Sequence, residues 1–305
     1  MTPHRLQETA QRYFLEVVRS GSLTEAAARL NVSASAISRQ VAMLEELLGT
    51  PLFERRPRGM VPSAAGELLA AHARRSALEA ERVVSDIQGL QGLQRGHVRI
   101  ACSSGFANEF LPRAIVAFRA LHPGIQFDLK ACDPIDVTGA VLLGDADIGL
   151  TYSRAAMQGI RVAHRQPASV FALMRPDHAL ARQRSVTLAQ MLPFPLALSG
   201  PDTTVRQLFD VACSNRGVVF GPALVSNRFE ALASFVLHGG GLAIAGEISV
   251  RERVRRGELH AAPIRERGLR ERSVELQTLA GRTLPEVVQV FLEFLCEALR
   301  PPTAP

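Results

Sequence analysis

The sequence predicts a multidomain protein in which a small all-α segment and one long helix precede a larger α/β domain. The chain has 305 residues, which is long for one core and suits two or three compact units. Short helix-like segments come first, a single helical segment follows, and strand-like and helix-like segments alternate after residue 96. The chain has no run of eighteen apolar residues and begins without a signal-peptide pattern, so we expect a cytoplasmic protein with no membrane partner.

The segment from Ser22 to Val41 has the residue types of a helix-turn-helix, in the order that this motif requires. Ser22 and Glu25 have the spacing of a capping box, which predicts a helix directly after the serine. Asn31 stands where the tight turn needs a left-handed backbone, which Asn tolerates well. A second helix would begin after Ser33 and bury an apolar face formed by Ile37, Val41 and Leu44.

The outward face of this second helix is small and polar. Such a helix can enter the major groove of DNA and present its side chains to base edges. The sequence therefore predicts DNA contacts at Ser33, Ala34, Ser35, Ser38 and Arg39. An ordinary helical hairpin without a DNA function is the alternative interpretation of this segment alone.

Residues 51–62 predict a short hairpin, or wing, beside the second helix. Gly49 can end that helix in the left-handed conformation, and Leu52 and Phe53 would anchor the wing in the core. Arginines near its tip would bind DNA phosphates, which adds affinity but no sequence information. They are Arg55, Arg56 and Arg58. The alternative is that these arginines form a solvated surface cluster. Net charge does not distinguish the two interpretations, because residues 1–96 carry only +2 of the total charge of +6.

Residues 63–94 predict one long helix, which Ser63 can cap. Apolar or small residues recur along it at spacings of three and four, at Ala65, Leu69, His72, Ser76, Ala80, Val83, Ile87 and Leu90. A helix of about thirty residues is about 45 Å long and cannot bury such a stripe against itself. We therefore expect it to pair with the same helix of a second chain.

The remaining sequence alternates between strands and helices, which predicts open parallel sheets with ligand sites beyond the carboxyl ends of the strands. The expected strands are 97–102, 126–131, 148–152, 171–175, 196–199, 223–225, 242–245, 259–262 and 274–280. The expected helices are 107–121, 135–143, 204–212 and 285–299.

Polar residues follow several of these strands, where they would line a pocket for a small-molecule effector. Hydroxyls and backbone N–H groups at the start of a helix suit a small anion. The candidate effector-binding residues are Ser103, Ser104, Asp133, Thr203, Thr204 and Asn227. The alternative is that these residues are helix caps only, since Ser, Thr and Asp are common there. Asp133 would disfavour a carboxylate in its vicinity.

No pattern in the sequence indicates an enzyme, a metal site or a bound cofactor. A nucleophile elbow, an HExxH motif and a phosphate-binding loop are all lacking, and we expect Asp145 and Asp147 to be structural. Metal-ligand spacing is absent from the four cysteines, Cys102, Cys132, Cys213 and Cys296. Cys102 and Cys132 end neighbouring strands, and we expect inert buried thiols in preference to a redox pair.

The first seventy residues together resemble the LysR-type transcriptional regulators. The resemblance rests on Tyr13-Phe14, Gly21 to Ala27, Val32 to Gln40, Leu44-Glu45, Leu48-Gly49, Leu52 to Arg55 and Ala65-Gly66. One departure concerns the bases that the protein reads. The family often has Gln and then a polar residue after the Val-Ser pair, whereas this chain has Ala34 and Ser35.

A weaker resemblance to the effector domain of that family continues through Ile100 to Pro112, Leu143 to Asp147, Pro176 to His178 and Gly239 to Ala243. It implies a two-lobed α/β domain, similar to a periplasmic binding protein, with a cleft between the lobes. The implied domains are a winged helix-turn-helix (1–62), a dimerising linker helix (63–94) and an effector-binding domain (95–305). Lobe one would cover about 97–163 and 271–305, and lobe two about 164–270.

The resemblance also implies a mode of action. Linker helices would form an antiparallel dimer, and a tetramer would bind and bend a two-fold operator in promoter DNA. A small metabolite in the cleft would shift the angle between the lobes, and RNA polymerase is a further candidate partner. The alternative is a solute-binding protein or an enzyme built on the two-lobed domain. The first would lack a helix-turn-helix, and the second would carry a catalytic motif.

Overall fold

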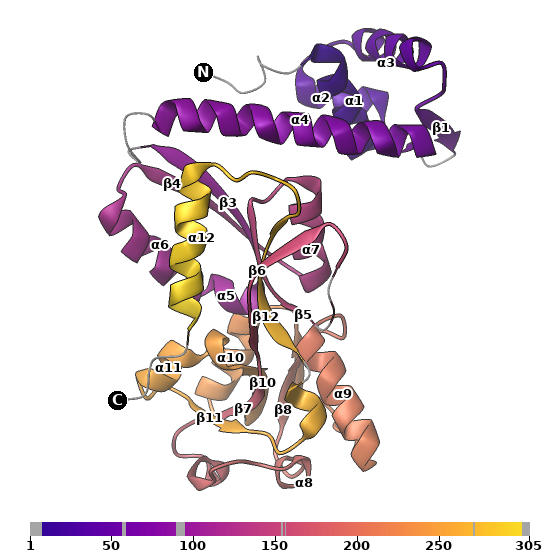
Figure 1. Cartoon of the computed structure of the whole chain (residues 1–305). Coiled ribbons are helices and arrows are strands. Elements are labelled where there is room, and N and C mark those ends of the chain that lie inside the picture. The colour runs from indigo at the N-terminus through magenta and orange to yellow at the C-terminus, as the bar shows by residue number, and fades with distance from the viewer. Residues whose placement is uncertain are drawn as a thin grey trace. The chain divides into compact units, whose positions relative to one another are not determined.

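The computed structural model describes residues 8–56, 59–89, 95–153, 155, 157–270 and 272–300. The chain forms two compact units, the first built mainly from residues up to 89 and the second mainly from residues after 95 (Figure 1). Within these described ranges, no helix combines the length and the apolar character that crossing a membrane requires.

The first unit begins with three helices, α1 (Thr9–Ser20), α2 (Leu23–Leu30) and α3 (Ala34–Leu48). Ser22 caps α2, because its Oγ accepts a hydrogen bond from the Glu25 backbone N–H at 3.4 Å. The Glu25 carboxylate instead accepts a bond from Arg29 Nη2 at 2.6 Å. The serine half of the predicted capping box is therefore confirmed, while its glutamate is engaged by the arginine one turn further along.

The turn between α2 and α3 has the predicted conformation. Asn31 has a φ of 53° and is the one described residue other than glycine with a positive φ. The Ser33 Oγ accepts a hydrogen bond from the Ala36 N–H at 3.2 Å and so caps α3, which ends at Gly49 in the left-handed region. The helix-turn-helix predicted from the sequence is thereby confirmed.

A two-stranded wing, β1 (Phe53–Arg56) and β2 (Gly59–Pro62), follows α3 in antiparallel pairing. Its base is fixed to the helices by backbone bonds. The Leu52 N–H donates to Glu45 Oε1 at 2.7 Å, and the Met60 N–H donates to the Gly21 carbonyl at 2.8 Å. Leu52 is fully buried in the helical core, so the wing has a defined position against the helix-turn-helix.

Helix α4 (Ala64–Gly89) is the long helix that the sequence predicts. Ser63 caps it by accepting a hydrogen bond from the Gly66 N–H at 3.1 Å. A Cβ at Gly66 would lie 2.1 Å from the Leu52 carbonyl oxygen, so only glycine allows this close approach to the wing. The described helix has 26 residues, about 39 Å; the predicted extension to residue 94 lies outside the described residues.

The second unit contains two five-stranded sheets (Figure 1). The first has the order β4-β3-β5-β12-β6, from strands Ile125–Cys132, Gly96–Ser103, Ile148–Ser153, Ser273–Leu279 and Ile160–Pro167. The second has the order β11-β7-β10-β8-β9, from strands His260–Pro263, Val170–Met174, Leu242–Gly246, Leu196–Ser199 and Leu224–Ser226. We call the parts around these sheets lobe one and lobe two.

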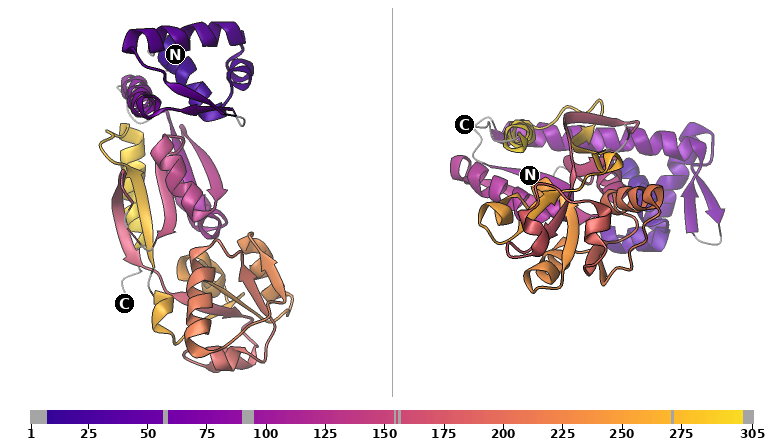
Figure 2. Two further views of the ribbon diagram at one scale, coloured as in Figure 1. Left: turned by 90° about the vertical axis from the view of Figure 1, so that its right-hand side faces the viewer. Right: turned by 90° about the horizontal axis from the view of Figure 1, so that it is seen from below.

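Helices cover both sheets (Figure 2). Lobe one contains α5 (Ser104–Ala107), α6 (Phe110–Leu121), α7 (Pro134–Leu143) and α12 (Glu286–Leu299). Lobe two contains α8 (Leu188–Met191), α9 (Thr204–Arg216), α10 (Phe229–Leu237), α11 (Arg251–Arg255) and the short 3-10 turns η2 (Ala179–Arg182), η3 (Glu247–Ser249) and η4 (Arg267–Arg270). The sequence patterns indicated neither β6 nor α10.

The sheets are mixed, so the expectation of wholly parallel sheets is wrong. In lobe one β12 runs antiparallel to β5 and β6, and in lobe two β7 runs antiparallel to β10 and β11. The cause is the double crossing of the chain, from β6 to β7 and from β11 back to β12. Each crossing leaves one sheet and enters the other at the edge where the parallel strands have their carboxyl ends. A strand that enters a sheet at this edge, as β7 and β12 do, therefore runs antiparallel to those strands.

Asp147 supplies a buried anchor between β3 and β5. Its carboxylate is 4% exposed and accepts hydrogen bonds from Arg99, at 2.9 Å from the backbone N, 3.2 Å from Nε and 2.8 Å from Nη2. The predicted structural role of this residue is thereby confirmed.

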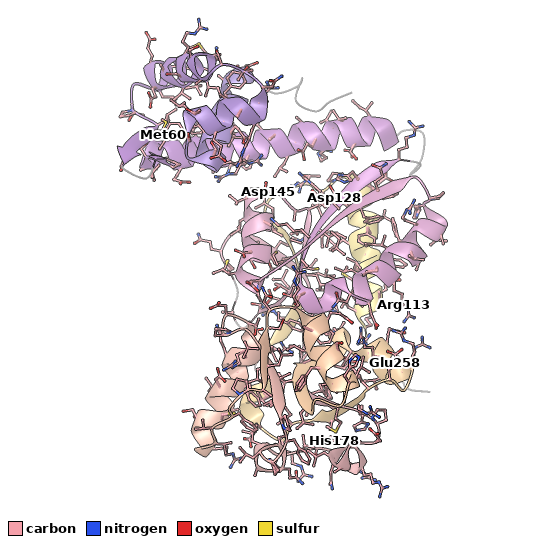
Figure 3. The ribbon with its side chains drawn as sticks, turned by 180° about the vertical axis from the view of Figure 1, so that it is seen from behind. Met60, Arg113, Asp128, Asp145, His178 and Glu258 are labelled. Atoms are coloured by element: carbon pink, nitrogen blue, oxygen red, sulfur yellow. The ribbon has the colours of Figure 1, made fainter. Side chains whose placement is uncertain are left out.

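We expect Asp147→Ala to lower the free energy of unfolding of the second unit by about 2–4 kcal/mol, because it leaves Arg99 without its buried counter-charge. Chemical denaturation of the full chain measures this loss. The matched control is Asp145→Ala, just after α7, whose side chain is exposed (Figure 3). Its removal should cost at most about 1 kcal/mol, because exposed charge interactions contribute little. Equal losses in the two variants would contradict the anchor.

Candidate functional site

The outward face of α3 is the first candidate site, and it carries most of the residues that the sequence predicts for it. Ser33, Ser35, Ser38 and Arg39 are exposed. The hydroxyls of Ser33 and Ser35 lie 3.0 Å apart and share a hydrogen bond. Ala34 differs, because it is partly buried and packs against the helical core. The surface that can reach a DNA groove is therefore formed by short hydroxyl side chains and one guanidinium.

The wing carries part of the predicted phosphate-binding cluster. Arg55 and Arg56 are the last two residues of β1 and pair in register with Met60 and Gly59. Arg58 lies outside the described residues. Since β1 and β2 are bonded to α1 and α3 as described above, the wing backbone and the α3 face belong to one compact unit.

A cavity of about 70 Å³ between the two lobes is the second candidate site. All six effector-binding candidates predicted from the sequence line it: Ser103, Ser104, Asp133, Thr203, Thr204 and Asn227. Ser103 is the last residue of β3, and the other five lie in the segments that follow β3, β4, β8 and β9. All six are at the carboxyl ends of parallel strands. This is where open α/β sheets bind ligands. We call it the cleft.

The hydroxyls in the cleft are held by short hydrogen bonds. Ser103 is 7% exposed, and its Oγ lies 3.0 Å from the Thr151 Oγ1. In the other lobe the Thr203 Oγ1 lies 2.7 Å from the Ser199 Oγ and also accepts a bond from the Arg206 N–H at 3.4 Å. Thr203 therefore caps α9 and lines the cleft at once, whereas the Ser103 hydroxyl makes no cap bond to α5.

Tyr152, Ser249 and Arg272 are among the further residues that line the cleft and that the sequence pattern did not indicate. The Tyr152 hydroxyl lies 3.1 Å from the Ser249 Oγ, which joins lobe one to lobe two. Tyr152 could have been predicted from the sequence, because it lies near the carboxyl end of β5, where ligand sites of open α/β sheets occur. Arg272 could not be predicted in this way, because it precedes β12, which is antiparallel to β5.

The buried aromatic ring of Tyr152 carries the guanidinium of Arg272 on its face, with 4.0 Å between the guanidinium carbon and the ring centroid. Burial raises the pKa of the Tyr152 hydroxyl, and the positive charge of Arg272 opposes that rise. Burial also lowers the pKa of Arg272. The cleft is therefore a poorly hydrated place in which electrostatic contacts are strong.

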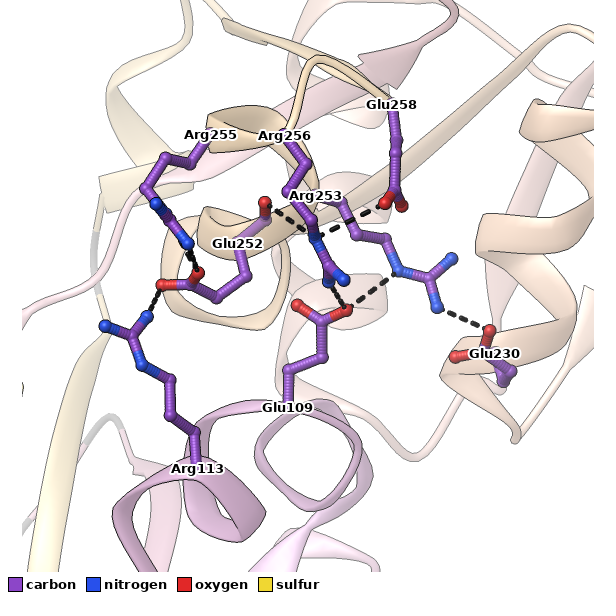
Figure 4. A network of polar contacts seen from close by, with 8 residues as sticks. All are labelled: Glu109, Arg113, Glu230, Glu252, Arg253, Arg255, Arg256 and Glu258. Atoms are coloured by element: carbon purple, nitrogen blue, oxygen red, sulfur yellow. Dashed lines mark hydrogen bonds and ion pairs between the residues drawn. The ribbon is translucent and has the colours of Figure 1, made fainter. Parts of the chain in front are cut away.

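A network of ion pairs lies outside the cleft and also joins the lobes (Figure 4). Glu109, at the start of α6 in lobe one, accepts from Arg256 at 2.5 Å and lies 3.4 Å from Arg253. Arg113 of α6 pairs with Glu252 of α11. Arg113 and Arg256 are at least half exposed, so their ion pairs contribute little by themselves, about 0–1 kcal/mol each.

The described cysteines are free thiols, and the two on neighbouring strands are poor candidates for redox chemistry. Burial, together with the nearby Cys132, raises the pKa of the Cys102 thiol to about 12. Burial is also the main cause that raises the pKa of Cys132. No group of three or more His, Cys, Asp or Glu side chains able to hold a metal occurs in the part of the chain that the structure describes.

Two family descriptions match this chain. Residues 9–67 match the bacterial regulatory helix-turn-helix proteins of the lysR family, and residues 91–300 match the LysR substrate binding domain. The chain belongs to the LysR-type transcriptional regulators. Its fold is therefore the winged helix-turn-helix joined to a two-lobed α/β domain that the sequence predicts, and its function is DNA-binding transcriptional regulation with an effector-binding domain.

Individual proteins agree with this assignment. This LysR-type regulator is 30% identical over 246 residues to YeiE of Escherichia coli K12, an uncharacterized HTH-type transcriptional regulator. The match covers 81% of this chain and 82% of YeiE. Its fold is similar to a full-length OxyR variant from Pseudomonas aeruginosa (TM-score 0.69, 18% identity, 100% and 99% of the two chains). It is also similar to full-length CbnR complexed with its target DNA (TM-score 0.52, 21% identity, 98% and 100%). Curated relatives of the chain are named as HTH-type transcriptional regulators, in agreement with the family.

We expect Cys102 to resist iodoacetamide in the native protein at pH 8, because a thiol of pKa about 12 is ionised in only about one molecule in ten thousand there. Mass spectrometry of labelled protein measures this. The same thiol should react at an ordinary rate after unfolding in guanidinium, which serves as the control. A Cys102–Cys132 disulfide formed under mild peroxide would contradict the expectation.

Proposed function

We propose that this regulator binds a two-fold promoter site through α3 and the wing and responds to a small molecule held in the cleft. The observation that carries the proposal is the cleft, in which hydroxyls from both lobes converge at the carboxyl ends of their strands. We assign residues 1–62 to DNA binding, 63–94 to dimerisation and 95–305 to effector binding. Lobe one is assigned to about 97–163 and 271–305, and lobe two to about 164–270.

In the DNA complex, Ser35, Ser38 and Arg39 would face the major groove, and the wing arginines would bind phosphates. Arg39 can donate two hydrogen bonds to guanine, while the serine hydroxyls can donate to or accept from several base edges. The similarity to CbnR, solved with its target DNA, supports this arrangement for the first unit. Because Ala34 is partly buried, the contacts with DNA bases would be made mainly by Ser35, Ser38 and Arg39.

Helix α4 supports the proposal of an oligomer. It exposes the apolar side chains of Leu68, Val83 and Ile87, and the exposed His72 lies on the same face of the helix. An exposed apolar stripe of this kind on a long helix suits pairing with an identical helix. We assign a dimer to this helix and a tetramer to the full regulator, acting in the cytoplasm with RNA polymerase as a further partner. Two recognition helices at fixed spacing would then read the two halves of the operator.

The response requires that the ligand distinguish between arrangements of the lobes. A ligand with equal affinity for all of them would shift nothing, however tightly it bound. Because the cleft is lined from both lobes, a molecule in it contacts both walls and favours the lobe angle that fits it best. A thermal-shift screen of purified protein against metabolites, followed by DNA footprinting with each stabilising compound, tests this. Stabilisation by DNA alone, with no active metabolite, would contradict it.

We expect Arg39→Ala to weaken binding to the operator. If Arg39 contacts a phosphate, the slope of log affinity against log salt concentration should fall by about one. If Arg39 contacts guanine, the preference for that base should be relaxed. Fluorescence anisotropy over a salt series, with operator and with unrelated DNA, separates the two. Arg184→Ala is the control, because Arg184 is exposed in lobe two. Unchanged affinity, slope and preference for Arg39→Ala would remove Arg39 from the interface.

We expect Ser103→Ala to abolish or reduce the response to a ligand found in the screen while basal DNA binding persists. The matched control is Thr151→Val, which removes the same buried hydrogen bond but leaves the Ser103 hydroxyl in the cleft. Thermal shift and footprinting measure the response. Equal effects of the two variants would show that Ser103 acts through packing and not through contact with the ligand.

A further inference from the structure

Arg272 is a buried cation with no anionic partner among the described residues. Only 3% of it is exposed. Its Nε donates to the Ala168 carbonyl at 3.3 Å, and its guanidinium lies over the Tyr152 ring. The Nη2 atom is buried and has no hydrogen-bond partner in the described structure. At least one strong donor of this guanidinium is therefore left unused.

Such a group is unfavourable in a folded protein. An ionised side chain that is buried without a counter-charge loses its hydration and gains little in return. The pKa of Arg272 is lowered by this burial, yet an arginine remains protonated at neutral pH. The described carboxylates near the cleft do not relieve it. Asp133 lies on the exposed rim, and Glu247 is paired with Arg251 at 2.8 Å.

The position of Arg272 connects the cleft to both crossings of the chain. It lines the cleft, and a Cβ built on Gly246 would lie 2.7 Å from its Nη2, so glycine at 246 keeps space beside the unused donor. Its carbonyl accepts a hydrogen bond from the Ala168 N–H at 3.0 Å. Ala168 lies on the crossing from β6 to β7, and Arg272 lies on the crossing from β11 to β12. A group bound to Arg272 therefore contacts the hinge of the two lobes.

We propose that Arg272 recognises the carboxylate of the effector, and that the effector is a small monocarboxylic acid. This inference rests on the proposed function of the cleft. The unused Nη2 donor and the positive charge favour an anion, and the hydroxyls of Ser103 and Thr203 can bind polar groups on the rest of the molecule. The cavity of about 70 Å³ limits the ligand to a few non-hydrogen atoms in this arrangement. Asp133 on the rim opposes a second negative charge.

The test compares acids with their uncharged counterparts. Propionate, lactate and pyruvate are titrated into the full-length protein at constant ionic strength, in parallel with propionamide, lactamide, pyruvamide and inorganic phosphate. Thermal shift and calorimetry give the affinities. The variants are Arg272→Met, Arg272→Lys, which keeps the charge but not the planar donor, and Arg184→Met as a matched exposed control.

We expect at least one carboxylate to bind the wild-type protein and its amide to bind at least about tenfold more weakly. Arg272→Met should lose at least about tenfold in carboxylate affinity, Arg272→Lys should recover part of it, and Arg184→Met should match the wild type. Equal binding of acid and amide, undiminished binding to Arg272→Met, binding of phosphate alone, or no binding by any of the acids would overturn the proposal.

DNA binding separates this inference from the proposed function. Anisotropy with operator DNA is recorded for the same variants, and Arg184→Met, whose side chain is exposed outside the cleft, should bind it as the wild type does. If a neutral metabolite from the screen still alters the footprint through the cleft, the function stands and the carboxylate assignment fails. If no metabolite alters it in the wild type, the effector function itself fails.

Discussion

The backbone pairing of Ala168 with Arg272 is the constraint on which the second unit depends. The chain crosses between the lobes twice, and these two residues join the crossings through the Ala168 N–H and the Arg272 carbonyl at 3.0 Å. Because both crossings lie on the side where the parallel strands end, the loops after β3, β4, β8 and β9 all open toward the same space. The position of the cleft and the mixed direction of the sheets therefore have a single cause.

Close backbone contacts fix the wing and α4 of the first unit against its helical core. Gly66 allows α4 to lie against the Leu52 carbonyl, and a Cβ at Gly59 would lie 2.5 Å from the Gly21 carbonyl oxygen. Glu45 adds a bond from α3 to the base of the wing. These contacts orient β1 and β2 relative to the recognition helix. An element that binds phosphates and an element that reads bases must keep such a fixed relation if the phosphate contacts are to set the register on DNA.

Local signals made the first unit predictable from the sequence. Ser22, Asn31, Ser33 and Gly49 each act on the backbone within a few residues, and the structure shows each cap or turn where its chemistry requires it. The shared location of the six cleft candidates could also be predicted, because parallel strands place their carboxyl ends on one edge of the sheet. Strand direction after a crossing is different, because it depends on where the chain returns. This is why the mixed sheets could not be predicted.

Arg272 could not be recognised for the same reason. In the sequence it is one arginine among many, beside Glu271 and before a strand. Its burial results from the meeting of two crossings about a hundred residues apart, and its contact with Tyr152 joins it to a third segment. Buried charge that arises from such long-range packing leaves no local pattern. The sequence shows where a cleft can form, whereas the charge inside it becomes visible only when the chain is folded.

The forces that join the lobes are small enough for a ligand to shift the angle between them. The Tyr152–Ser249 hydrogen bond contributes about 1 kcal/mol, and each half-exposed ion pair of the α6–α11 network contributes about 0–1 kcal/mol. A complete reversal of a two-state equilibrium requires a difference in binding free energy of about 5.5 kcal/mol. A charged contact at the hinge and a few hydroxyl contacts supply energies of this order. In the proposed mechanism, contacts of this strength hold the lobes together and still allow a bound ligand to shift the angle between them.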